Sequence, residues 1–358
     1  MNDTDEEMYD RPKPVGTNIE VFPYENSIDP KIAVKALLNG DYVLIEDLYS
    51  SGLTVLNCLK SHLKLTLPDQ SFKGQRDSRS EYHDLSNKLL LLIRNNRLTV
   101  KKAPEIGWLK ILYPGINEFL LPFPQVQGLN SSWQWYKNGI TIPGLGKKIH
   151  PFYGTYFPTR FEHLKLFDDW LKQYRGEKKS AIDIGIGSGI LSFMMLKSGF
   201  KKIYGTDCNR NAIAGLKESL EKDAFQSKIE LMHGDLFSGI DILSELIVFN
   251  PPWLNANHNY EGLDNAIYYD NDLFPRFFSE AQKNLLPDGR IVLLFSNLDK
   301  ITSVSSTHPI ETELLQNRRY SRELYLQKSV GPASESTRRN QTWRSTEMVE
   351  LWVLRLNK

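Results

Sequence analysis

The chain has 358 residues, of which 41% are hydrophobic and 24% are charged, and its 44 basic and 43 acidic side chains leave a formal net charge of +1. A charge this close to zero excludes a strongly basic nucleic-acid-binding protein, and the apolar content excludes a largely disordered chain. The length exceeds that of a usual single core, so we expect two domains.

Cysteine content and hydropathy favour a cytoplasmic protein. Cys58 and Cys208 are too few for a disulfide framework or a four-thiolate zinc site. The N-terminal residues lack a basic segment followed by an apolar stretch, and no segment approaches the roughly 20 apolar residues that span a bilayer. The seven histidines show no metal-ligand spacing. We therefore expect a cytoplasmic location, no membrane partner and no metal site.

The first third of the chain predicts a mobile arm followed by a helical domain. Residues 1–27 are polar and dotted with prolines, which is typical of a mobile arm. Asp29, Pro30 and Gly40 suit the cap, the first turn and the end of a helix. Two more helices are expected at 53–65 and 85–93. The pattern predicts a mainly helical N-terminal recognition domain over residues 28–130.

Aromatic residues, glycine and proline become frequent between Ile116 and Pro158. Trp133, Trp135 and Tyr136 precede Asn138-Gly139, a dipeptide typical of a type I′ hairpin turn. We expect a β-hairpin linker over residues 131–157, which joins the first domain to a second domain over residues 158–358.

Strand and helix patterns alternate through the second domain, which predicts an α/β fold with an open, mostly parallel sheet. The final two strands, expected at 323–329 and 348–356, predict an antiparallel edge. The other strands are expected at 180–184, 202–207, 229–233, 246–250 and 290–295, and the helices at 162–174, 190–197, 209–224 and 273–284.

A glycine-rich turn follows the first strand of this domain. Asp183-Ile-Gly185-Ile-Gly187-Ser-Gly189 places glycines where a backbone turns tightly and lets a ligand approach. A dinucleotide fingerprint needs its third glycine one place later, where this chain has Ile190. A carboxylate at Asp183 suits a cationic amino group and would repel phosphates. The turn therefore disfavours a dinucleotide and the dehydrogenase that would use one.

Two further acids follow the next strands. Asp207 ends the second strand, where it can accept hydrogen bonds from a ribose diol, and Asp235 follows the third, where it can accept from an adenine amine. Either acid alone is more often a cap or turn residue. Their joint placement with Asp183 predicts a site for a nucleoside with an amino-acid tail.

The order of these residues, followed by Asn250-Pro251-Pro252-Trp253, resembles the class I S-adenosylmethionine-dependent methyltransferases over about Phe152 to Lys358. The resemblance implies S-adenosyl-L-methionine as cofactor and a Rossmann-like, seven-stranded sheet with an antiparallel edge strand. It also implies cofactor-binding roles, with the methionine part beside the glycine turn, the ribose on Asp207 and the adenine on Asp235 or the backbone of Leu236. The implied residues around the methionine part are Asp183, Gly185, Gly187 and Gly189.

The segment Asn250-Pro-Pro-Trp253 ends the fourth strand, at the sheet edge where open α/β sheets bind their ligands. A planar amide or aromatic amine has a delocalised lone pair, so its N–H groups must be held while the lone pair faces a methyl donor. The Asn250 side-chain oxygen and the Pro251 carbonyl can accept those N–H groups, Pro252 helps fix the backbone, and Trp253 offers a flat stacking surface. The pattern predicts methyl transfer promoted mainly by positioning.

This motif is similar to the Asn-Pro-Pro-aromatic signature of methyltransferases that act on glutamine amides or on exocyclic amines of adenine and guanine. The layout upstream, with Phe157-Pro158-Thr159-Arg160-Phe-Glu162 before a helix, is similar to the release-factor glutamine N5-methyltransferases. In those enzymes a Pro-Arg-Pro-Glu-Thr element stands there, and this chain inserts one residue between its proline and its glutamate. The resemblance implies that Phe157, Pro158 and Thr159 cover one side of the cofactor.

Two basic stretches leave a nucleic-acid substrate open. One contains Lys88, Arg94, Arg97, Lys101 and Lys102 without an intervening acid, and the other contains Arg338, Arg339 and Arg344 between the last two strands. Such runs are more often solvated surface than binding sites.

The sequence thus predicts an S-adenosylmethionine-dependent N-methyltransferase for a planar nitrogen in a macromolecule, with a protein glutamine amide favoured over nucleic acid. The alternatives are a nucleobase N-methyltransferase acting on RNA or DNA and a non-catalytic cofactor-binding subunit. The oligomeric state is left open.

Overall fold

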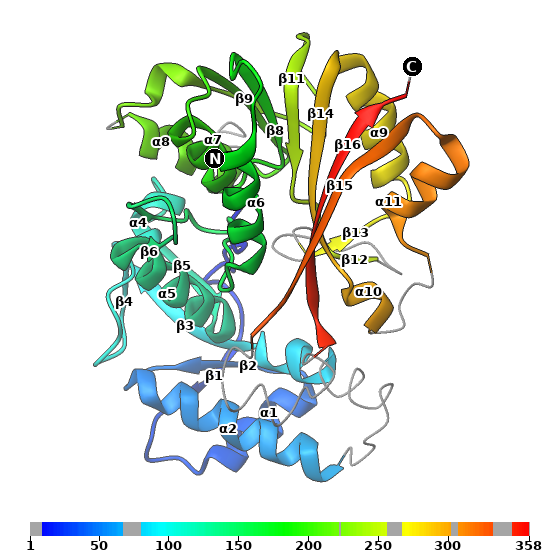
Figure 1. Cartoon of the computed structure of the whole chain (residues 1–358). Coiled ribbons are helices and arrows are strands. Elements are labelled where there is room, and N and C mark those ends of the chain that lie inside the picture. Colours follow the sequence, from blue (N-terminus) through cyan, green and yellow to red (C-terminus); the bar gives the residue numbers. More distant parts are fainter. Residues whose placement is uncertain are drawn as a thin grey trace. The chain divides into compact units, whose positions relative to one another are not determined.

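Figure 1 shows a computed structural model of the chain, which describes residues 9–66, 80–221, 223–255, 267–301, 307–331 and 346–357. The contacts divide the chain into two compact units, Met1–Lys137 (unit 1) and Asn138–Lys358 (unit 2). The boundary lies within the segment for which the sequence predicted a linker hairpin. Within the described ranges, no helix combines the length and the apolarity needed to cross a bilayer.

Unit 1 contains a mixed sheet and several helices. The central strand β3 pairs in parallel with β2 and antiparallel with β4 and β5, and β2 pairs in parallel with the edge strand β1. The strands are β1 (Val21–Tyr24), β2 (Tyr42–Ile45), β3 (Leu89–Arg94), β4 (Arg97–Leu98) and β5 (Glu118–Pro122). The helices are α1 (Pro30–Asn39), α2 (Tyr49–Thr66), α4 (Trp108–Leu112) and α5 (Phe123–Asn138). The helix expected after Asp29 is α1, which Asp29 caps by accepting the Lys31 N–H.

The prediction of a mainly helical first domain missed the mixed sheet of unit 1. Residues 89–93, Leu-Leu-Leu-Leu-Ile, form β3 instead of the end of a helix, and an unbroken apolar run has no period that separates a buried strand from a buried helix. A two-residue turn at Asn95 and Asn96, with φ of 50° and 61°, connects β3 to β4, as in a type I′ hairpin.

The prediction of a mobile arm over residues 1–27 was also wrong for part of its length. Val15 forms a bridge with Leu120, and β1 adds a strand to the sheet of unit 1. Proline is tolerated in edge strands, which explains how Pro23 lies within β1.

The hairpin predicted around Asn138-Gly139 is displaced. Trp133, Trp135 and Tyr136 lie on α5, where Trp133 and Tyr136 are one helical turn apart and their rings stack at 5.5 Å. A short antiparallel pair, β6 (Ile140–Thr141) and β7 (Lys148–Ile149), follows the helix. Asn138 ends α5 rather than forming a hairpin turn, because the aromatic residues pack at helical spacing against Trp108.

Unit 2 is built on one sheet in the order β10-β9-β8-β11-β14-β16-β15, which holds seven of the described strands. The first five in this order run parallel, and β16 pairs antiparallel with both β14 and β15. The strands are β8 (Ser180–Ile184), β9 (Lys202–Asp207), β10 (Ile229–His233), β11 (Ser244–Phe249), β14 (Leu285–Ser296), β15 (Tyr320–Ser329) and β16 (Met348–Leu356). The predicted α/β, Rossmann-like fold is confirmed.

Helices cover both faces of this sheet (Figure 1). One face packs against α6 (Glu162–Gln173), α7 (Ile190–Lys197) and α8 (Arg210–Leu220), and the other against α9 (Leu273–Asn284) and α11 (Pro309–Thr312). Along β11, Leu246 and Val248 face the first set while Ile247 and Phe249 face the second, as the two-residue period of a strand requires. The remaining elements are η1 (Gln226–Lys228), β12 (Leu254–Asn255), β13 (Tyr268–Tyr269), α10 (Leu298–Ile301) and η3 (Glu313–Asn317).

Candidate functional site: the carboxyl edge of the unit 2 sheet

The glycine turn connects β8 to α7. Gly185, Gly187 and Gly189 have φ of 63°, 54° and 76°, which lie in the left-handed region that other residues rarely adopt. At Gly187, an added Cβ would stand 3.8 Å from the nearest atom, so backbone conformation rather than lack of space requires glycine. Ile190, at the dinucleotide position of the third glycine, is a buried first residue of α7.

Asp183 lies beneath this turn, near the end of β8. Its side chain is 1% exposed, and its Oδ2 accepts a hydrogen bond of 2.6 Å from the Ser192 hydroxyl of α7. Its Oδ1 is buried and has no partner among the described residues. Burial raises the pKa of Asp183 to about 7. A buried carboxyl group with an unused oxygen is suited to receive a cation.

Asp207 ends β9 and binds the glycine turn directly. Its Oδ2 accepts the Gly187 N–H at 2.8 Å, and its Oδ1 accepts the Asn209 N–H at 2.8 Å. Burial raises the pKa of Asp207, although these two N–H donors act in the opposite direction. A carboxylate offers about four acceptor positions. Asp207 can therefore keep both contacts and still accept from a diol.

Asp235 is less well placed than the other two acids. Its side chain is 56% exposed and forms an ion pair with Arg276 of α9. The adjacent Leu236 is buried, has a φ of 44°, and its carbonyl accepts a hydrogen bond from the Thr206 hydroxyl of β9. The backbone at Leu236 is thus tied to the strand that carries Asp207, whereas the Asp235 carboxylate points to another partner.

The segment before α6 runs over the glycine turn. The Gly154 carbonyl accepts a hydrogen bond of 2.8 Å from the Asn209 side chain, and the Tyr156 carbonyl lies 3.9 Å from the position of a Cβ on Gly187. Phe157 packs against the core, Pro158 is buried and Thr159 is exposed. Sequence reasoning missed Gly154 and Tyr156, because neither residue type signals a ligand.

The segment Asn250-Pro-Pro-Trp253 follows β11, which lies between β8 and β14. Trp253 is half-buried and packs against both hydrophobic cores of unit 2. Its Nε1–H points to Asn250 Oδ1 at 3.2 Å and to the Leu294 carbonyl of β14 at 3.3 Å. Asn250 is thus held at the same sheet edge as Asp183 and Asp207, as the sequence predicted for residues that end parallel strands.

Residues of the α6 entry add buried polar groups to this edge. Arg160 Nη1 donates to Glu347 Oε2 at 2.8 Å, with side chains 18% and 5% exposed. Arg160 Nη2, Glu162 Oε2 and the Ser296 hydroxyl at the end of β14 are buried and have no partner among the described residues. His163 is 3% exposed, and its ring lies 5.4 Å from that of Trp253 at 89°. Burial lowers the pKa of His163 to about 4, so the ring is neutral near pH 7.

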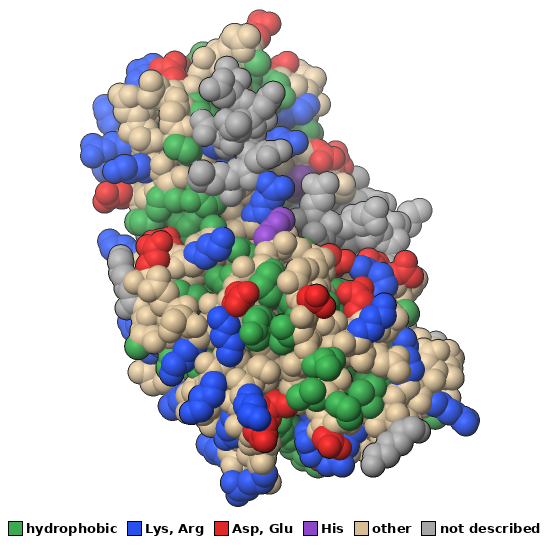
Figure 2. Space-filling view, turned by 90° about the horizontal axis from the view of Figure 1, so that it is seen from above, with side chains coloured by type: hydrophobic (Ala, Val, Ile, Leu, Met, Phe, Trp, Pro, Cys, Tyr) green, Lys and Arg blue, Asp and Glu red, His purple; other side chains and the backbone are tan. Residues whose placement is uncertain are grey.

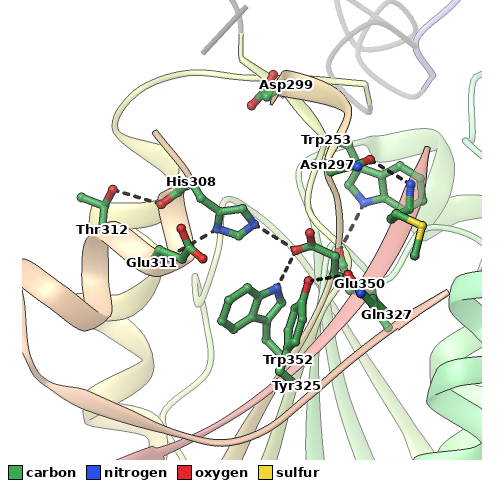
Figure 3. A network of polar contacts seen from close by, with 12 residues as sticks. Trp253, Asn297, Asp299, His308, Glu311, Thr312, Tyr325, Gln327, Glu350 and Trp352 are labelled. Carbon is green, nitrogen blue, oxygen red and sulfur yellow. Dashed lines mark hydrogen bonds and ion pairs between the residues drawn. The ribbon is translucent and has the colours of Figure 1, made fainter. Parts of the chain in front are cut away.

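A second polar cluster lies on the opposite face of the sheet, around Glu350 of β16 (Figure 3). Its carboxylate accepts hydrogen bonds from His308 Nε2 at 3.0 Å and from the Trp352 indole at 2.8 Å. Burial opposes ionisation of Glu350, but the contacts with His308, Trp352 and Tyr325 together outweigh it, and the net pKa is below the ordinary value. The cluster ties α11 to the antiparallel edge of the sheet and serves the fold.

Arg338, Arg339 and Arg344, the basic stretch between the last two strands, lie outside the described residues.

The edge of the sheet fits S-adenosyl-L-methionine. It combines a buried carboxyl oxygen without a partner, a left-handed glycine turn and a second acid bonded to that turn. When bound, this cofactor supplies an electrophilic methyl group on a sulfonium. The chain's own acceptor groups at Asn250 and Pro251 follow β11, the strand that pairs with β8.

The family model named "Methyltransferase small domain" matches residues 165–320. The chain is 28% identical over 166 residues to a protein of Methanocaldococcus jannaschii named "Putative protein N5-glutamine methyltransferase"; the match covers 44% of this chain and 80% of that one. It is 29% identical over 119 residues to "Ribosomal RNA small subunit methyltransferase C" of Alcanivorax borkumensis, covering 33% of each.

A third relative is "Ribosomal protein L11 methyltransferase" of Enterococcus faecalis, with 28% identity over 167 residues. That match covers 45% of this chain and 50% of the relative, so the chain spans half or less of the length of two of these three relatives. All three are named methyltransferases, and the matched family model covers the strands that carry the glycine turn, both following acids and Asn250. Residues 165–320 therefore carry a methyltransferase domain, for which S-adenosyl-L-methionine is the methyl donor.

Proposed function

We propose that the protein transfers a methyl group to a planar nitrogen of a macromolecule, and that a protein glutamine amide is the acceptor. The observation that carries the proposal is the position of Asn250-Pro-Pro-Trp253 after β11, one strand from the glycine turn. An amide side chain and a proline carbonyl at this place supply two hydrogen-bond acceptors for the two N–H groups of a primary amide.

The cofactor is proposed to lie across the ends of β8, β9 and β10. Asp183 would attract the amino group of the methionine part, which passes Gly185, Gly187 and Gly189. Asp207 would hold the ribose hydroxyls with its remaining acceptor positions. The backbone near Leu236 is a better adenine contact than the Asp235 side chain, because Arg276 already engages that carboxylate. Phe157, Pro158 and Thr159 would cover the cofactor, with Tyr156 closest to the glycine turn.

At the reacting end, the Asn250 side-chain oxygen and the Pro251 carbonyl would fix the N–H groups and turn the nitrogen lone pair toward the methyl group. Pro252 limits the freedom of the backbone, and the Trp253 ring borders the acceptor. Because the nitrogen loses its proton only after the methyl group arrives, positioning is the main requirement.

A glutamine amide is favoured because the M. jannaschii relative, which the chain covers at 80% of its length, is named for that acceptor. The family model begins at residue 165, and unit 1 lies outside it. We therefore assign to unit 1 the recognition of the macromolecular substrate.

A nucleobase amine is the second candidate, since another relative is named for ribosomal RNA. Arg97, Lys101 and Lys102 are exposed, whereas Arg94 pairs with Glu118. On the face seen in Figure 2, basic and acidic side chains are interspersed rather than gathered into one field. This distribution supports a nucleic-acid substrate less than a protein substrate.

Labelling of a cell extract tests the proposal. The purified protein and S-adenosylmethionine with a tritiated methyl group are added, and the product is treated with protease or nuclease. Release of the label by protease supports the protein acceptor, and release by nuclease alone would replace it with the nucleobase candidate. An extract treated with Asn250→Ala protein is the matched control, and equal labelling by this variant would overturn the assigned site.

A further inference from the structure

The indole N–H of Trp253 fixes which end of the Asn250 amide faces it. An indole N–H only donates, so the amide oxygen rather than the amide nitrogen must lie 3.2 Å away. An amide oxygen has two acceptor positions, and the contact with Trp253 uses one of them. None of the described residues donates to the other position, which is available for an incoming N–H group.

Trp253 is in turn held from two sides. Its N–H is shared with the Leu294 carbonyl of β14 at 3.3 Å, which limits rotation of the indole in its own plane. The ring of His163, the second residue of α6, meets it at 89°. Since His163 is 3% exposed and neutral near pH 7, its contact supplies shape and carries no charge to the site.

Among the described residues, the ring contact with Trp253 is what ties His163 to the site.

We propose that Trp253 and His163 are positioning residues, which hold Asn250 with its amide oxygen toward the acceptor N–H. The inference rests on the proposed function, in which that oxygen receives the acceptor. If the amide turned over, its NH₂ group would face the N–H groups of the acceptor and repel them. His163 fixes the position of the Trp253 indole, and the indole N–H fixes the orientation of the Asn250 amide. The amide oxygen then orients the nitrogen to be methylated.

The contact can be tested without any substrate, by proton–nitrogen NMR of protein with isotope-labelled tryptophan. The seven tryptophans give seven indole signals, and the one missing from Trp253→Phe belongs to Trp253. Asn250→Ala should shift this signal and quicken its hydrogen exchange. The Trp352 indole, held by Glu350, is the internal control and should stay in place. A Trp253 signal that is unchanged in Asn250→Ala would overturn the proposal.

Kinetics test the consequence of the contact. We expect Trp253→Phe, which keeps a ring but loses the N–H, to lower kcat by about 10–100-fold, the scale of a misplaced reacting group. The affinity for S-adenosylhomocysteine should not change. His163→Phe keeps the ring contact and should retain kcat within about two-fold. His163→Ala loses the ring contact and should lower kcat to the same extent as Trp253→Phe.

Turnover by Trp253→Phe at the rate of the parent protein would refute the positioning role and leave the proposed function intact. A parent protein that labels no acceptor, although the indole signal responds to Asn250→Ala, would refute the proposed function instead.

Discussion

The carboxylate of Asp207 accepts the backbone N–H of Gly187 at 2.8 Å, so the acid that ends β9 and the glycine turn after β8 form one hydrogen-bonded unit. The same carboxylate also accepts from Asn209, whose side chain holds the Gly154 carbonyl. One acid thus joins the turn, the start of α8 and the segment that crosses the turn.

We expect Asp207→Ala to weaken binding of S-adenosylhomocysteine by about 100-fold. The variant loses charge-assisted hydrogen bonds to the ligand, and the glycine turn loses the acceptor of its Gly187 N–H. Isothermal titration calorimetry measures the change. Asp235→Ala is the matched control, since that carboxylate is half-exposed and paired with Arg276, and its loss should cost less than about 10-fold. Equal affinities of Asp207→Ala and the parent protein would remove Asp207 from the cofactor site.

The raised pKa of Asp183 predicts a pH dependence of stability. The folded protein keeps a proton on Asp183 up to about pH 7, whereas in the unfolded chain the group ionises near its ordinary value of 3.8. The stability that the neutral group contributes is complete below 3.8 and is lost as the pH rises through about 7. Asp183→Asn should therefore gain in thermal unfolding midpoint relative to the parent protein as the pH rises through this window. A difference that does not vary with pH would contradict the assignment.

Asp183 also predicts how cofactor affinity responds to pH. Only the ionised carboxylate attracts an amino group, so binding of S-adenosylhomocysteine should strengthen as the pH rises to about 7. Titrations in buffers on either side of this pH measure the effect. Asp183→Asn should bind more weakly and with little change over the same range; a parallel pH profile in the variant would assign the effect to another group.

The lowered pKa of His163 predicts that folding stability changes with pH in the opposite direction, at acidic pH. Its folded pKa of about 4 lies below the ordinary value of 6.5, because burial disfavours the charged ring. The stability of the neutral form is present above 6.5 and is lost as the pH falls toward 4. His163→Phe should gain in unfolding midpoint relative to the parent protein as the pH falls. Because the slopes of Asp183 and His163 oppose each other, the parent profile alone cannot separate them, and each variant is compared with it.

Removing one partner of the buried Arg160–Glu347 pair should lower the free energy of unfolding, and removing the second charge as well should restore much of it. Arg160→Met leaves the buried Glu347 carboxylate without its partner, which should cost about 3–5 kcal/mol in the free energy of unfolding. Adding Glu347→Gln should recover much of the loss. The exposed Arg276–Asp235 pair is the comparison, and breaking it should cost less than about 1 kcal/mol. Denaturant unfolding measures all variants, and equal losses at the two pairs would contradict the buried role.

The alternation of strand and helix in unit 2 was predictable, because each element has its own apolar pattern and its own stop signal. The bounds of β8, β9, β10, α7 and α9 match those expected from the sequence. Acids at the ends of parallel strands were predicted to meet, since the carboxyl ends of such strands share one edge.

Unit 1 could not be predicted in the same way. The residues of β3 are buried and lack alternation, so they carry no strand period. Trp133 and Trp135 have the spacing of one face of a strand, whereas Trp133 and Tyr136 have that of one helical turn, and packing against Trp108 decides for the helix. In the site, the contacts of Trp253 with His163 and Asn250 depend on tertiary placement, so residue types alone did not reveal His163.

The position of the methyl group in the product tests the central claim most directly. Mass spectrometry of the labelled acceptor, with fragmentation that locates the group, should place it on a planar nitrogen, namely the side-chain amide of a glutamine, and Asn250→Ala protein should leave that residue unmodified. A methyl group on an oxygen, a thiol or a lysine amine would contradict the account, because none of these acceptors needs the paired oxygens of Asn250 and Pro251.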